Sequence, residues 1–250
     1  MEQDLFLKRL YDLAGRAYNN NCYTFTDFLA PAEISDFYGI SRKSEFKGAK
    51  VFGGYDEAER AVIRFGDESE LGYSVDFPIM IVRIQPLIMK FSDKLSHRDI
   101  LGAIMNLGIT REMIGDIILK DNIAHVMVLD KMADYIVENL TKIKHTNVKA
   151  VIDNEADVSS QVQMAEKNII ASSVRIDGIV SKIYNLSRSE SINLFRDKKI
   201  FVNSRSCENN SYQLKDGDVV SVRGYGKFIF DRTGSMTRSG RYNISIRIYV

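Results

Sequence analysis

The first third of the chain begins with two helical patterns and continues with two strand patterns. Apolar side chains recur at helical spacing from Phe6 to Ala17, and a run of three asparagines then interrupts the pattern. Pro31 suits the first turn of a second helix, and Gly39 suits the position just past its end. The predicted elements are a helix ending near residue 19, a helix over 31–38, and strands over 50–54 and 60–66.

The middle third alternates strand and helix patterns. The predicted elements are strands over 79–84, 116–120, 124–129 and 148–152, and helices over 96–107 and 131–141. This order is the split βαββαβ arrangement of ferredoxin-like domains, which RNA-recognition motifs share with many other proteins. RNA-recognition motifs stack bases on aromatic side chains of their two central strands, and the corresponding strands here contain no aromatic residue. We therefore expect this sheet to make protein or backbone contacts, or to act as a scaffold.

The last third carries two short helical patterns followed by strands. Apolar residues from Ile176 to Ile183 recur at helical spacing. Ser187 and Glu190 have the spacing of a capping box, which predicts a second helix that ends near Asp197. The predicted fold is α+β in three small domains: an N-terminal α/β domain over 1–75, a central ferredoxin-like (RRM-like) domain over 76–170, and a C-terminal domain over 171–250.

Composition is that of an ordinary soluble globular protein of 250 residues, with 45% hydrophobic and 27% charged residues. No apolar run approaches the roughly 20 residues that a membrane-spanning helix needs. The acidic start Met-Glu-Gln-Asp-Leu does not fit a secretory signal, so we expect a cytoplasmic protein. We also expect a monomer without a membrane partner. Cys22 and Cys207 share no metal-ligand spacing, and we expect no metal and no cofactor.

The near-zero net charge of +1 conceals an asymmetry along the chain. From residue 171 onward there are 14 Lys and Arg against 7 Asp and Glu, or +7, whereas the first 170 residues carry 20 against 26, or −6. Binding to a polyanion is driven largely by counterion release, which requires a positively charged surface. The basic last third is therefore the expected nucleic-acid-binding part. Arg98 and Arg111 could extend a basic surface into the middle third.

The candidate contacts are cations of the last third together with polar residues at a helix start and at a turn. They are Arg175, Lys182, Ser187, Arg188, Lys198, Lys199, Asn203, Arg205, Arg223 and Lys227. Open backbone amides after Ser187, with Arg188 beside them, form a phosphate site. The two lysines after this helix suit its dipole and can also reach a polyanion. Two alternatives stay open: each cation alone could be a solvated surface group, and Asn203 could only shape a turn.

The C-terminal segments resemble the S4-type RNA-binding domain, also called the alpha-L motif. The matching segments are Arg175-Ile176-Asp177, Ser187-Arg188-Ser189, Lys199-Ile200-Phe201-Val202-Asn203 and Asp216-Gly217-Asp218-Val219-Val220. The whole chain is similar to the YlmH family of bacterial proteins, with further support from residues 52–55, 96–102, 114–117 and 222–228. That family joins such a C-terminal domain to a ferredoxin-like RNA-binding domain and an N-terminal segment.

This resemblance implies a non-catalytic protein that binds ribosomal RNA of the large ribosomal subunit, with tRNA as a further partner, in ribosome rescue or quality control. Family members are encoded near cell-division genes, so a division adaptor is one alternative. The other is an RNA-modifying enzyme of the pseudouridine synthase or methyltransferase type. The first 170 residues contain no cofactor-binding glycine loop, and Arg98-Asp99 lacks the Leu that the catalytic Arg-Leu-Asp setting of a pseudouridine synthase requires.

Overall fold

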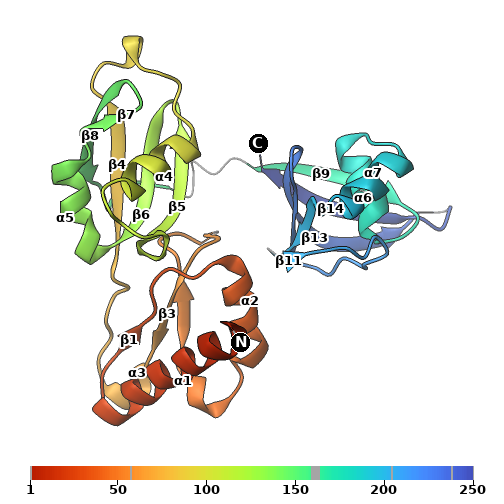
Figure 1. Cartoon of the computed structure of the whole chain (residues 1–250). Coiled ribbons are helices and arrows are strands. Elements are labelled where there is room, and N and C mark those ends of the chain that lie inside the picture. Colours follow the sequence, from red (N-terminus) through yellow and green to blue (C-terminus); the bar gives the residue numbers. More distant parts are fainter. Residues whose placement is uncertain (1, 57, 159–163, 204, 238, 250) are drawn as a thin grey trace. The chain divides into compact units, whose positions relative to one another are not determined.

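The computed structural model describes residues 2–56, 58–158, 164–203, 205–237 and 239–249. The chain divides into two compact units, Met1–Gln161 and Val162–Val250. The described residues form three β-sheets (Figure 1). Each sheet packs on its own cluster of buried apolar side chains. The α+β class expected from the sequence is confirmed.

The N-terminal part of the first unit is a three-stranded sheet with two main helices. Its elements are α1 (Glu2–Asn20), β1 (Thr24–Phe25), α2 (Pro31–Ile40), the 3₁₀ turn η1 (Ser44–Phe46), β2 (Lys50–Phe52), β3 (Val62–Phe65) and the short α3 (Glu68–Leu71), with the strand order β1-β3-β2. Gly39 does not end the second helix as predicted. The helix continues through it to Ile40, and the cap residue Ser41 keeps a right-handed helical conformation.

The central part of the first unit has the predicted split βαββαβ order. Its elements are β4 (Ile79–Pro86), η2 (Met89–Phe91), α4 (His97–Met105), η3 (Arg111–Met113), β5 (Ile114–Lys120), β6 (Ile123–Leu129), α5 (Asp130–Asn139), β7 (Lys142–Ile143) and β8 (Thr146–Ile152). All pairings are antiparallel in the order β5-β6-β4-β8-β7. The sequence did not predict β7, which forms a tight hairpin with β8 through Lys144 at a φ of +52°.

The second unit is a six-stranded sheet with two helices. Its elements are β9 (Met164–Ala171), α6 (Ile176–Tyr184), α7 (Arg188–Arg196), β10 (Ile200–Val202), β11 (Arg205–Ser206), β12 (Asp218–Val222), β13 (Gly226–Met236) and β14 (Tyr242–Tyr249). The strand order is β11-β10-β12-β13-β14-β9. Figure 1 shows both helices together against the sheet, where their apolar residues join those of the strands in one core.

Strand β9 corrects one predicted domain boundary. It pairs with β14 along its whole length, from Ala171 opposite Tyr242 to Met164 opposite Tyr249. The unit boundary therefore lies between Gln161 and Val162, not between residues 170 and 171. This strand escaped prediction because it is an edge strand that buries only Ile169 and Ala171. The predicted boundary between residues 75 and 76 lies inside one compact unit and stays a prediction.

The carboxylate of Asp116 joins the N-terminal and central parts of the first unit. It accepts hydrogen bonds from the Tyr55 hydroxyl at 3.0 Å, from the Glu59 amide at 2.6 Å and from the Arg60 amide at 3.2 Å. Burial raises the pKa of Asp116 above its ordinary value, although these three donors act in the opposite direction. One side chain of β5 thus fixes the loop that precedes β3.

Two half-buried arginines complete this junction, which we call the Asp116 clasp (Asp116, Tyr55, Glu59, Arg60 and Arg111). Arg60 donates to the carbonyls of Ile114 at 3.0 Å and Phe28 at 2.8 Å, and Arg111 donates to the carbonyls of Ile114 and Gly115. Burial lowers the pKa of both guanidinium groups, that of Arg111 to about 10. Arg111 therefore does not extend a basic surface as the sequence suggested.

Replacing Asp116 by Ala is expected to lower the free energy of unfolding of the first unit by about 3 kcal/mol, because three donors lose their acceptor and two half-buried arginines lose the nearby negative charge. Tyr55→Phe is the matched control. It removes one of the three hydrogen bonds and is expected to cost about 1 kcal/mol. Urea unfolding followed by circular dichroism measures both values, and equal losses would show that the carboxylate contributes no more than its bond to the phenol.

Candidate nucleic-acid interface

The start of α7 is fixed by the capping box that the sequence predicted. The Glu190 amide donates to the Ser187 hydroxyl at 3.2 Å, and the Ser187 amide donates to the Glu190 carboxylate at 2.8 Å. The hydrogen bonds from Ser187 lower the pKa of Glu190. Arg188 follows as the first helical residue, is exposed, and has no ion-pair partner among the described residues. The helix start therefore offers a cation beside oriented backbone amides.

Arg175 and Asp177 form an ion pair that fixes the start of α6. Arg175 donates to both carboxylate oxygens of Asp177, at 3.1 and 2.7 Å, and the carboxylate also accepts the Gly178 amide at 2.8 Å. Asp177 is buried, and its carbonyl accepts a hydrogen bond from Ser191 of α7 at 2.8 Å. Asp177 raises the pKa of Arg175. Arg175 thus stabilises the start of α6, and it could contact RNA as predicted only while it also holds Asp177.

Asn203 uses both polar atoms of its side chain within its own turn. Its amide nitrogen donates to Asp218 at 2.9 Å, and its amide oxygen accepts the Val219 amide at 3.0 Å. The residue has a φ of +48°, a left-handed conformation that Asn tolerates better than most residues. These bonds favour the alternative in which Asn203 shapes a turn.

Lys198 and Lys199 lie at the end of α7 and each pair with an acidic residue. Lys198 pairs with Glu208 at 3.0 Å, and Lys199 pairs with Asp197 at 3.0 Å. All four side chains are largely exposed, and ion pairs of this kind contribute little, so a phosphate can replace either carboxylate. The Arg223 amide donates to the Lys199 carbonyl at 2.9 Å, which brings the cation of the β12–β13 turn next to these lysines.

Arg223 and Lys227 each lie over an aromatic ring. The Arg223 guanidinium is 4.5 Å from the centre of the Phe201 ring, and the Lys227 ammonium is 4.6 Å from the centre of the Tyr249 ring. Phe201 pairs with Ser221, and Ser221 pairs with Lys227. The core beneath the helices buries their strand neighbours Ile200, Val202, Val220, Val222 and Phe228. Since successive side chains of a strand point to opposite faces, Phe201, Ser221 and Lys227 lie on the face away from α6 and α7.

The ten predicted residues therefore do not form one continuous face. Lys182 and Arg188 lie on α6 and α7, which form the helix layer on one face of the sheet, and Lys198 and Lys199 follow the end of α7. Lys227 lies on the opposite face of the sheet. Arg205 lies on the short edge strand β11. Two aromatic residues beside the cations, Phe201 and Tyr249, were not predicted as site residues.

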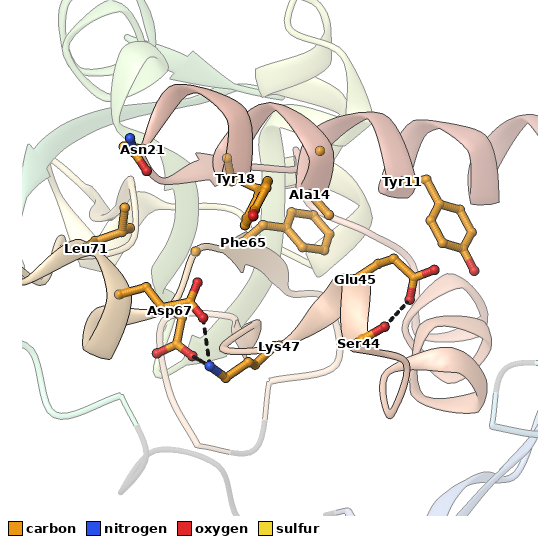
Figure 2. Close-up of a pocket in the computed structure, with 14 residues that line it drawn as sticks. Tyr11, Ala14, Tyr18, Asn21, Ser44, Glu45, Lys47, Phe65, Asp67 and Leu71 are labelled. Atoms are coloured by element: carbon orange, nitrogen blue, oxygen red, sulfur yellow. Dashed lines mark hydrogen bonds and ion pairs between the residues drawn. The ribbon is translucent and has the colours of Figure 1, made fainter.

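The first unit contains an apolar cavity of about 380 Å³ (Figure 2). Figure 2 shows Tyr18 of α1 beside Phe65, with Tyr11 toward one end of the cavity and Leu71 toward the other. The one lysine of the lining, Lys47, pairs with Asp67 at 3.2 Å and with Glu70 at 2.7 Å. Its charge is compensated, so the cavity adds no positive surface for a polyanion.

Other kinds of site were also sought in the part of the chain that the structure describes. There, three or more His, Cys, Asp or Glu side chains nowhere gather as metal ligands. None of the described helices combines the length and the hydropathy needed to cross a membrane. Cys22 and Cys207 are half-buried free thiols.

Comparison with known proteins connects the first unit to a named family. Residues 73–157 match the family model described as "Putative RNA-binding domain in YlmH". The central domain is therefore similar to the RNA-binding domain of YlmH proteins. The matched range contains all five strands of the β5-β6-β4-β8-β7 sheet, so the YlmH RNA-binding domain is the βαββαβ domain described above.

Two further similarities to YlmH-type proteins cover more of the chain. It is 26% identical over 224 residues to "Ribosome-associated protein quality control protein P2" of Bacillus subtilis (strain 168), across 88% of this chain and 85% of that protein. A solved structure, "Cell division protein ylmH from Streptococcus pneumoniae", is 22% identical with a TM-score of 0.49, and covers 61% of this chain and 92% of that chain. The YlmH resemblance inferred from the sequence is confirmed, whereas the S4-type identity of the second unit stays a prediction.

Ser187→Ala removes the hydroxyl that caps α7, and we expect it to lower the free energy of unfolding of the second unit by about 1 kcal/mol. Ser187→Asp is the matched control, because its carboxylate can accept the same amide hydrogen bond and should keep most of the stability. Hydrogen exchange of the amides at the start of α7 checks the result. Unchanged protection in the alanine variant would contradict a stabilising cap.

Proposed function

We propose that this YlmH-type protein binds ribosomal RNA of the large ribosomal subunit, holds peptidyl-tRNA there, and acts without catalysis in ribosome-associated quality control in the cytoplasm. The observation that carries the proposal is the pairing of a YlmH RNA-binding domain with a strongly basic second unit. Residues 162–250 contain 15 Lys and Arg against 8 Asp and Glu. The similarity to the quality control protein of Bacillus subtilis supports the ribosomal setting.

The physical chemistry of the second unit suits folded RNA. Phosphates are recognised by cations and by backbone amides at a helix start, and α7 offers both at Ser187 and Arg188. Lys198 and Lys199 lie at the other end of the same helix, where their acidic partners are exposed. Such contacts recognise shape and backbone, as double-stranded RNA requires, and they need few contacts with base edges.

The central sheet suits a supporting role. Its two central strands, β4 and β6, contain no Phe, Tyr or Trp, so they lack the rings on which RNA-recognition motifs stack bases. The N-terminal part is rich in acidic residues, and its cavity lysine is already paired. We infer that most of the RNA affinity comes from the second unit, and that the first unit positions it.

Charge reversal tests this assignment. The variant Arg188→Glu with Lys199→Glu is expected to bind large ribosomal subunits at least 10-fold more weakly, and to reduce the slope of log affinity against log salt by about 2, because two phosphate contacts are lost. Co-sedimentation of the full chain with purified large subunits over a range of salt concentrations measures both quantities.

The matched control places the same charge change elsewhere. Lys8→Glu with Arg16→Glu alters two exposed cations of α1 and leaves the second unit intact. It is expected to leave the affinity within about twofold of the parent chain. Equal losses in the two double variants would show that only the net charge matters, and absence of the parent chain from large-subunit fractions at every salt concentration would refute the proposal.

A further inference from the structure

We propose that the helix-free face of the six-stranded sheet is a second RNA site, which takes unpaired nucleotides by stacking; this inference rests on the proposed RNA-binding function. We call this surface the open face, and define it by Phe201, Ser221, Lys227 and Tyr249 together with Arg223, Arg232 and Arg247. It differs from the helix layer that carries Lys182 and Arg188 in both position and chemistry.

The register of the strands places four of these residues in one row. Phe201 of β10 pairs with Ser221 of β12, and Ser221 pairs with Lys227 of β13. The pairing of Phe228 with Ile248 puts Lys227 opposite Tyr249 of β14, and the Lys227 ammonium lies over that ring. The row therefore begins and ends with an aromatic ring, about 14 Å apart across three strand spacings of ~4.8 Å.

A cation accompanies each ring of the row. Arg223 lies 4.5 Å from the centre of the Phe201 ring, and Lys227 lies 4.6 Å from the centre of the Tyr249 ring. A nucleobase can stack on an aromatic ring or on the plane of a guanidinium, and the neighbouring cation then lies within reach of the phosphate. Both rings are half-buried, so stacking would meet a ring that is already held in place.

The remaining charges of the open face favour a polyanion. Arg247 lies on the same side of β14 as Tyr249 and pairs with Asp231 at 2.9 Å. Arg232 is exposed and pairs with Ser245. Ile244 and Ile246, the strand neighbours of Ser245, are fully buried in the core, so Ser245 and Arg232 lie on the open face. Glu166 of β9 lies opposite Arg247, so Asp231 and Glu166 are the carboxylates beside the cations Arg223, Lys227, Arg232 and Arg247. These cations outnumber the carboxylates around a row with a ring at each end. This combination fits single-stranded RNA, whereas a duplex keeps its bases stacked and offers no ring face to Phe201 or Tyr249.

Fluorescence can report stacking directly, because the chain contains no tryptophan. Phe201→Trp in the full chain introduces a single indole on the open face, and a 12-nucleotide oligouridine is the probe. We expect saturable quenching of the indole on titration. The matched control is Tyr242→Trp, since Tyr242 packs against the helix-covered core of the same sheet, and its fluorescence should stay constant.

Affinity gives an independent measurement. Phe201→Leu with Tyr249→Leu removes both rings but keeps apolar side chains and every cation, and it should weaken oligouridine binding about 10-fold or more. The slope of log affinity against log salt should stay unchanged, because the phosphate contacts remain. Circular dichroism of each variant verifies the fold. Oligouridine binding at parental affinity by the folded double leucine variant, or an unquenched indole at position 201, would overturn the inference.

These outcomes separate the inference from the proposed function. If the parent chain sediments with large subunits while the leucine variant binds oligouridine normally, the open face is not an RNA site and the ribosomal role stands. If the open face binds oligouridine but the parent chain never sediments with large subunits, the ribosomal proposal is wrong and the second site stands. If the parent chain neither binds oligouridine nor sediments with large subunits, both the second RNA site and the ribosomal proposal are wrong.

Discussion

The second unit depends on one constraint: a six-stranded sheet has helices on only one of its faces. Because side chains alternate along each strand, every residue beneath α6 and α7 joins the core, and every neighbour points the other way. Ile200, Val220, Val222 and Phe228 belong to the buried set. Their neighbours include Phe201, Ser221 and Lys227, which form the row of the open face. The same alternation that stabilises the unit therefore also creates a sheet face that α6 and α7 do not cover.

Local signals allowed much of this fold to be predicted from sequence. Ser187 and Glu190 are three residues apart, and their reciprocal hydrogen bonds are local, so the start of α7 was predictable without knowledge of tertiary structure. Strand β9 was not predictable in this way, because its structure comes from pairing with β14, which lies about 80 residues later. Without β9 and the registers, the side of the sheet on which Phe201 and Tyr249 lie could not be assigned. Tertiary context also determines the role of Arg111, whose half-buried guanidinium donates to backbone carbonyls instead of adding to a basic surface.

The cations of the second unit differ in what they must give up to bind a phosphate. Arg175 holds a buried carboxylate with two hydrogen bonds, and loss of that pair would leave Asp177 uncompensated at the start of α6. Lys198 and Lys199 pair with exposed carboxylates and can exchange them at small cost. Arg188 has no described ion-pair partner to lose. Net charge alone does not distinguish these cases, so the count of cations in the last third overestimates the number available to RNA.

The first unit shows the opposite use of charge. In the Asp116 clasp, two arginines and one aspartate are partly withdrawn from water and join the β3 sheet to the β5-β6-β4-β8-β7 sheet. Desolvation of this kind is costly unless every donor and acceptor is satisfied, and here the bonds run to backbone carbonyls and amides on both sides of the junction. Gly115 allows Phe28 to pack closely against β5 at this junction, because an added Cβ would lie 2.6 Å from the Phe28 ring. The clasp thus joins the acidic N-terminal part to the βαββαβ domain within one compact unit, because each part supplies donors or acceptors that the other satisfies.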